Sequence, residues 1–300
     1  MERQEDEKII VQSLIGGSDL PFYVRCLKSL LAFCQERIDL QLHTDGSLSQ
    51  EDKDSIYAEL DGTLVTIPDT SQNTSRVLDC LQGRPNCQKV RKDSIWGIEF
   101  FDPIFAFPDD PISFYLDADI LFLHPFSGLF DRNQVKNGAI FLSDTQWDAY
   151  SFRPWHMLIG KNKPQAVRGI TTGLVFWDKA AIDWDYLEWF LGENNLHQIP
   201  EWIIPSAQAG LATRCEAKTI APRQITNLYP NARIQEDTFG VHLLGSYRKE
   251  WMEKLEAREK KQIENLPTIL PSFEECVSQN VFGYSLRQMR RWKNTRLNLW

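Results

Sequence analysis

Two aspartates separated by one residue interrupt an apolar stretch near the middle of the chain. Asp117 and Asp119 follow the run Phe114–Leu116 and precede Ile120–Leu123. Ionised carboxylates lose their hydration when they are buried, so apolar runs normally exclude them. Side chains at i and i+2 leave the same face of an extended chain, and two carboxylates on one face can bind one cation. We therefore expect a divalent metal site at the end of a central strand; the alternative is a polar loop at a sheet edge.

A histidine followed by two cations lies later in the chain. His242 stands in the apolar segment Val241–Leu244, and Arg248 and Lys249 follow it closely. A lone histidine on an apolar strand is more often a core residue than a ligand. With a guanidinium nearby, however, His242 as third metal ligand and Arg248 on a phosphate form a coherent pair.

Alternating strands and helices have to position these residues. Apolar runs bounded by turn residues predict strands, and helices are expected to begin near Pro21 and Ser49. This alternation favours an α/β domain with parallel strand pairing. The predicted strands cover residues 9–15, 39–45, 63–68, 139–144 and 170–177, and further helices are predicted over 185–191 and 206–212.

Ligands of such sheets bind at the carboxyl ends of the strands. This rule places Ser13, Gly16 and Asp45 on the rim that also carries the two aspartates. The chain has neither a GxGxxG fingerprint nor a GxxxxGK[ST] loop. Any nucleotide would therefore have to be bound without these motifs. Upstream of the aspartates, Lys92 belongs to a cationic cluster. This cluster is either a solvated helix face or a binding site for a diphosphate.

Composition and charge limit the classes of function that are open to the protein. The 300 residues are 42% hydrophobic and 25% charged, which is typical of a globular protein, and the net charge of −8 argues against nucleic-acid binding. No apolar run is long enough to span a bilayer, and the acidic N-terminus does not resemble a signal peptide. Six cysteines without metal-binding spacing favour reduced thiols and a cytoplasmic protein.

Three segments together resemble GT-A-type glycosyltransferases. Leu116–Asp119 resembles their DxD strand, and Thr171–Phe176 resembles their N-S-G-h-h-h segment. Val241–Trp251 is similar to the H-h-x-G-x-x-K-P-W segment of glycogenin-like and galactinol-synthase-like enzymes. The resemblance covers about residues 8–255 and implies a Rossmann-like α/β fold with a mixed, mostly parallel sheet flanked by helices. We accordingly expect a glycosyltransferase domain over 1–255 and a basic, helical C-terminal extension over 256–300.

The resemblance implies a metal-dependent enzyme that moves a sugar from a UDP- or GDP-sugar to an unidentified acceptor, which could be a glycan, a protein, a lipid or a small molecule. The ion would be Mn²⁺ or Mg²⁺, bound by Asp119, His242 and Asp117, and Asp117 could also contact the ribose. Thr172 and Gly173 would face the donor sugar, and Arg248 or Lys249 would take the diphosphate. With the rim residues, the predicted donor-binding set is Ser13, Gly16, Asp45, Lys92, Asp117, Thr172, Gly173, Arg248 and Lys249.

The acceptor side departs from the family pattern. The expected acidic D-Q or E-Q element reads Ser206-Ala207-Gln208, which leaves Gln208 and Asp144 as the candidate catalytic residues. The missing carboxylate also motivates an alternative, a non-catalytic relative that binds nucleotide sugars or glycans. A phosphatase of the haloacid-dehalogenase type is a further alternative, because it also uses a strand that ends in DxD.

The C-terminal segment Arg287–Lys293 is basic and amphipathic and contains no acidic residue. It either packs over the domain as a helix or contacts a membrane surface or a partner. In the second case the protein would be peripheral to a membrane.

Overall fold

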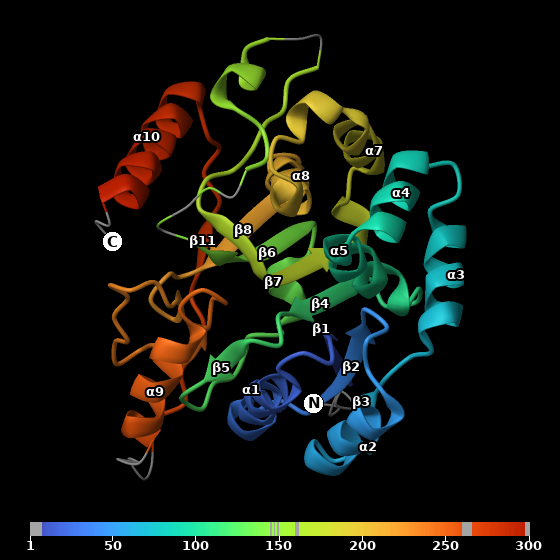
Figure 1. Cartoon of the computed structure of the whole chain (residues 1–300), viewed down its shortest axis with the longest axis vertical. Helices are drawn as coiled ribbons and strands as arrows, with labels where there is room; N and C mark the ends of the chain where they lie inside the picture. The colour runs from blue at the N-terminus through green and yellow to red at the C-terminus, as the bar shows by residue number, and fades with distance from the viewer. Residues whose placement is uncertain are drawn as a thin grey trace, which may run out of the picture.

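The computed structural model describes residues 8–144, 146, 148, 150–159, 162–259 and 266–297. Their central element is an eight-stranded sheet in the order β11-β8-β6-β7-β4-β1-β2-β3 (Figure 1). Its strands are β1 (Ile9–Ile15), β2 (Ile38–Thr44), β3 (Val65–Thr66), β4 (Ile112–Leu116), β6 (Gly138–Ser143), β7 (Ile170–Asp178), β8 (Glu216–Ile220) and β11 (Phe273–Glu275). The β4-β1-β2-β3 half is parallel, and β7 runs antiparallel to both β4 and β6. The expected mixed, mostly parallel sheet is confirmed.

A second sheet of three strands completes the site region. It consists of β5 (Ile120–Phe122), β10 (Gly240–His242) and β9 (Ile225–Asn227), with β10 in the middle. The apolar stretch around the aspartates therefore forms two strands, β4 and β5, that belong to different sheets. The chain leaves the large sheet at Leu116 and enters the small one at Ile120, so Asp117 and Asp119 lie in the turn between two sheets.

Helices surround the large sheet (Figure 1). The helix expected from Pro21 and the one expected after Ser49 are both present, and a capping box at Ser49 fixes the start of the second. The polar stretch 69–88, which the sequence does not place, forms α3 and the start of α4. The helices are α1 (Leu20–Phe33), α2 (Gln50–Glu59), α3 (Thr70–Cys80), α4 (Pro85–Asp93), α5 (Ile95–Ala106), α6 (Arg132–Val135), α7 (Trp184–Gly192), α8 (Ile203–Leu211), α9 (Arg248–Glu259) and α10 (Val281–Leu297), with short turns η1 (Pro154–Met157), η2 (Lys179–Ala181), η3 (Asn194–Leu196) and η4 (Pro200–Trp202).

Successive side chains along the strands point to opposite faces of the sheet, and a hydrophobic core lies on each face. Phe176 of β7 packs into the core that α1 and α2 cover, whereas its neighbour Trp177 packs into the core under α5, α7 and α8. Strands that are buried on both faces read as continuous apolar runs, which is why β4 and β7 are the clearest strands in the sequence.

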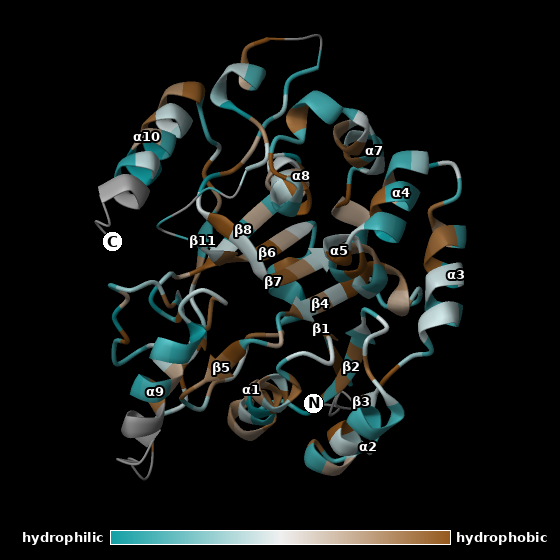
Figure 2. Ribbon diagram, in the orientation of Figure 1, coloured by the Kyte–Doolittle hydropathy of each residue, from teal (hydrophilic) through white to brown (hydrophobic). Residues whose placement is uncertain are grey.

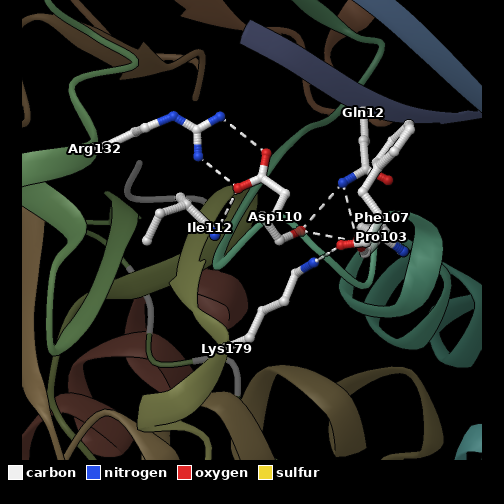
Figure 3. A network of polar contacts seen from close by, with 8 residues as sticks. Gln12, Pro103, Phe107, Asp110, Ile112, Arg132 and Lys179 are labelled. Carbon is white, nitrogen blue, oxygen red and sulfur yellow. Dashed lines mark hydrogen bonds and ion pairs between the residues drawn. The ribbon is translucent and has the colours of Figure 1, made fainter. Parts of the chain in front are cut away.

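Polar contacts hold the segment between α5 and β4 in place (Figure 3). Arg132 binds Asp110 through two hydrogen bonds, of 2.5 and 2.9 Å, and Asp110 also accepts the backbone N–H of Ile112. The Gln12 amide donates to the carbonyl of Pro103 at 3.0 Å. These contacts tie the end of α5 to β1 and the start of β4 to α6.

The C-terminal extension is present and is not purely helical. The strand β11 pairs antiparallel with β8 at the edge of the large sheet, and α10 follows it. The expected boundary at residue 255 falls within α9, and residues 260–265 lie outside the described chain. Figure 2 shows hydrophobic and hydrophilic residues alternating along α10. In the described part of the chain, no helix is both long enough and apolar enough to cross a membrane.

Candidate metal centre and donor site

Asp117, Asp119 and His242 meet at the carboxyl end of β4. One ligand atom from each lies within 4.8 Å of the others. The Nε2 atom of His242 is 3.1 Å from Oδ1 of Asp119 and 3.7 Å from Oδ2 of Asp117. The two sheets create this proximity, because His242 is the last residue of β10 and pairs with Ile120 directly after the aspartates. Segments that are about 120 residues apart in sequence thus converge on one point.

Neighbouring side chains orient the imidazole of His242. Its Nδ1 atom lies 2.8 Å from Oδ1 of Asn227, and the Asn227 amide donates to the carbonyl of Ser143 at 2.8 Å. Asn227 therefore presents its oxygen to Nδ1–H, which leaves Nε2 free to face the carboxylates. Metal-binding histidines in proteins are oriented in this way.

Gly173 leaves room for this histidine. A Cβ atom on Gly173 would lie 2.7 Å from Cε1 and 2.9 Å from Nδ1 of the His242 ring. The pairing of β6 with β7 also shifts here, from Val175 to Thr171, so residues 172–174 form an irregularity in β7. The glycine packs against the imidazole, and its carbonyl accepts the backbone N–H of Asp117 at 2.8 Å.

The charges of the three groups are strongly coupled. Burial and the charge of Asp119 raise the pKa of Asp117 to about 7. Burial would also raise the pKa of Asp119, but His242 and Arg248 hold it below its usual value. Burial would lower the pKa of His242, but Asp119 raises it. A proton on the imidazole thus offsets the negative charge of the carboxylates. A divalent cation could offset the same charge in its place.

These residues suit a divalent cation. Carboxylate oxygens with one imidazole form a ligand set that Mn²⁺ accepts, and Oδ1 of Asp119 faces Nε2 of His242 at 3.1 Å. The hydroxyl of Tyr115 donates to Oδ1 of Asp117 at 2.8 Å and fixes that carboxylate, while its Oδ2 faces the histidine.

Arg248 lies beside the metal centre. Its guanidinium contacts Asp119 at 3.2 Å and Asp19 at 3.0 Å, and it lies over the ring of Phe22 at 4.3 Å. Of the two cations considered for the diphosphate, the structure brings Arg248 to the carboxylates, whereas Lys249 is exposed in the first turn of α9.

The ends of β1 and β2 form a rim on the same edge of the sheet. Gly16 and Asp45 are neighbours there, because a Cβ on Gly16 would lie 3.0 Å from Oδ2 of Asp45. Ser13 is fully buried and its hydroxyl donates to the carbonyl of Leu116 at 2.6 Å, so it ties β1 to β4. Lys92 is exposed in the last turn of α4, and its contact with a diphosphate stays a prediction.

The two residues predicted to lie on the acceptor side have internal partners. Asp144 is buried and accepts the hydroxyl of Tyr229 at 2.7 Å. Gln208 is buried in α8 and accepts Nε1–H of Trp177 at 3.4 Å. A polar cleft of about 320 Å³ adjoins the metal centre at Asn227. It is lined by Ser143, Gln146, Pro222, Arg223, Thr226, Asn227, Tyr229, Asn231, Ala232, Arg233 and Gln235.

Glu99 is a carboxylate near the site that sequence reasoning missed. It lies on α5, where burial and the charge of Asp117 raise its pKa well above the usual value while a hydrogen bond from Thr172 opposes the shift. Glu99 and Gln208 line one cavity of about 10 Å³, room for roughly one water molecule. No local signal marks Glu99, because its charged neighbours are far away in sequence.

Several solved glycosyltransferases share this architecture. Mouse xyloside xylosyltransferase 1 matches with a TM-score of 0.53 and 12% identity, over 78% of this chain and 97% of that one. The galactosyltransferase LgtC in complex with donor and acceptor sugar analogues matches with a TM-score of 0.55 and 13% identity, over 86% and 98%. The chain has the GT-A glycosyltransferase fold. No protein-family profile and no curated protein matches the sequence.

An active-site mutant of LgtC matches with a TM-score of 0.57 and 13% identity, over 86% of this chain and 98% of that one. At such low identity the likeness concerns the fold, whereas the Asp117, Asp119 and His242 cluster is a property of this chain's own geometry.

Proposed function

We propose that the protein is a metal-dependent glycosyltransferase that uses a UDP- or GDP-sugar. The observation that supports the proposal is the cluster of Asp117, Asp119 and His242, which lies at the carboxyl end of β4 in a GT-A fold. A divalent cation held by these three side chains would neutralise charge on the leaving diphosphate. Mn²⁺ and Mg²⁺ both suit the carboxylates, and the imidazole favours Mn²⁺.

The remaining donor contacts follow from the positions of this chain's side chains. Arg248 lies close enough to the metal centre to exchange its ion pair with Asp119 for a phosphate oxygen. Gly16 and Asp45 form the rim on which a ribose and base would lie, because ligands of parallel sheets bind beyond the strand ends. The polar cleft at Asn227 has a volume suited to a sugar.

One observation supports a second candidate, a binding protein without transferase activity. Ser206 is fully buried, donating to the carbonyl of Trp202 and accepting the N–H of Ser151, and Ala207 has no polar group. The acceptor side therefore lacks the family's carboxylate, and Gln208 or Asp144 would have to take part instead. The phosphatase alternative has no support in the described residues, where no lysine contacts Asp117.

A thermal-shift screen of nucleotide sugars with and without Mn²⁺ tests the proposal. Binding to the native state raises the melting temperature. We expect stabilisation by one family of nucleotide sugars only when the metal is present. Stabilisation without turnover of any donor would favour the binding protein, and no metal-dependent stabilisation by any nucleotide sugar would refute both candidates.

A further inference from the structure

Exposed hydrophobic residues concentrate on one part of the surface. In the described chain, ten large hydrophobic side chains are exposed, and seven of them lie on α10 or in the segment of η1. This α10 patch consists of Trp155, Leu158, Ile159, Phe282, Leu286, Met289 and Trp292. The two segments pack against each other, so the patch is a shared surface. Exposed apolar side chains that concentrate in this way mark an interaction site.

The apolar face of α10 is not the face that holds the helix in place. Tyr284 is 1% exposed, and its hydroxyl donates to the carbonyl of Phe152 at 2.5 Å. Arg287 pairs with the buried Asp148, and Arg291 lies over the ring of Trp202 at 3.9 Å. The inward face is thus complete without the residues of the patch.

The outward face carries the apolar side chains at helical spacing. Phe282 and Met289 are seven residues apart and therefore lie on one side of the helix, where they are 74% and 67% exposed. Leu286 lies between them on the same side. Apolar side chains that are exposed to water do not stabilise the domain. Their presence here indicates that another surface covers them.

The charge of α10 is unlike that of the rest of the chain. Residues 281–297 contain Arg287, Arg290, Arg291, Lys293 and Arg296 and no carboxylate, whereas the whole chain has a net charge of −8. Arg290 and Lys293 are exposed beside the apolar residues, and Arg153 is exposed just before η1. An acidic protein can approach an anionic surface closely only through such a face.

We propose that the α10 patch binds the surface of an anionic lipid bilayer, with Trp155, Phe282 and Met289 entering the interface. Amphipathic helices with aromatic and aliphatic residues on one side and cations beside them bind membranes in this way. The protein is thereby peripheral to the membrane. The inference does not depend on the proposed transferase activity, because it concerns a surface made by other residues.

Flotation of the full-length protein with vesicles tests this. Vesicles of phosphatidylcholine alone are compared with vesicles that contain about 30% phosphatidylserine. We expect binding to the anionic vesicles only, and its loss at high salt. Arg290→Glu with Lys293→Glu should reduce the partition coefficient at least about tenfold. Phe282→Ser with Met289→Ser should reduce it similarly without changing the charge.

Matched controls separate the patch from general effects. Arg37→Glu with Lys136→Glu changes the net charge by the same amount at exposed positions elsewhere, and Leu270→Ser removes another exposed apolar side chain. Both should bind like the wild type. Equal binding by all variants, or no binding of the wild type, would overturn the proposal. A wild-type dimer that the Phe282 and Met289 substitutions convert to monomer would also overturn it, because the patch would then be a self-interface.

Discussion

The α-carbon of Gly173 faces the imidazole of His242 so closely that a methyl group has no room between them. A Cβ on residue 173 would come within 2.7 Å of Cε1 of the ring. The position of a candidate metal ligand on β10 thus depends on the absence of a side chain on β7. This relationship links the Thr171–Phe176 segment to the metal centre by packing.

Replacing Gly173 by alanine should therefore weaken metal binding. The new methyl group would push the ring of His242 away from Asp119 and from its partner Asn227. Loss of such orienting contacts typically lowers metal affinity about 10- to 100-fold. Calorimetric titration with Mn²⁺ measures the change. Gly245→Ala is the matched control, since a Cβ there meets nothing within 4 Å. Equal affinities of the two variants would show that Gly173 does not position the ligand.

Substitution of Glu99 by glutamine should have opposite effects on the metal-free and metal-bound protein. Glu99 is half-buried near Asp117, so its ionisation costs free energy in the metal-free native protein, whereas the unfolded chain ionises it freely. Removing this cost should stabilise the metal-free protein by about 1 kcal/mol, and losing a carboxylate that a cation would help to ionise should lower the affinity for Mn²⁺ several-fold. Urea unfolding and metal titration measure the two effects. A loss of stability without change in metal affinity would mean that Glu99 only packs α5.

The buried ion pair of Arg91 with Asp102 should be important for stability. The two side chains are 5% and 1% exposed, and Arg91 donates to Oδ2 of Asp102 at 2.8 Å. Arg91→Met leaves a carboxylate buried without its partner, which should cost about 3–5 kcal/mol. In urea unfolding, the additional change Asp102→Leu should recover much of that loss. If the double variant is no more stable than Arg91→Met, the unpaired charge is not the cause.

Stability should fall in mild acid partly because of His43. Burial lowers the pKa of His43 to about 3, and its Nε2 atom contacts Gln12 at 3.0 Å. Below pH 6.5 the unfolded chain binds a proton at this residue that the native protein does not. This difference lowers the free energy of unfolding by up to about 1.4 kcal/mol per pH unit. Unfolding curves of the wild type and His43→Gln between pH 6.5 and about 4 should therefore diverge as the pH falls; parallel curves would contradict this.

The fold and the metal cluster were predictable from local signals. The apolar runs of β1, β4 and β7 are buried on both faces, so their patterns do not depend on knowledge of partners. The spacing of Asp117 and Asp119 indicated a cation site, and His242 with Arg248 close after it indicated a third ligand. The structure brings these three residues together.

Other features depend on contacts that the sequence does not display. Arg91 reads as one cation of a solvated cluster, yet it is buried, because α5 folds back on α4 and supplies Asp102. Glu99 has no local signal, since its neighbours Asp117 and Thr172 come from the turn after β4 and from β7. The change of sheet between β4 and β5 also has no local signal, because both flanks of the aspartates are equally apolar.

Metal-dependent release of nucleotide from a sugar donor is the most direct test of the central claim. Wild-type protein and Asp119→Ala are compared with UDP- and GDP-sugars, with and without Mn²⁺, and circular dichroism verifies that the variant is folded. The account predicts release by the wild type that requires the metal, and loss of at least about 100-fold in the variant. Full activity of folded Asp119→Ala, or release by the wild type that is indifferent to metal, would contradict it.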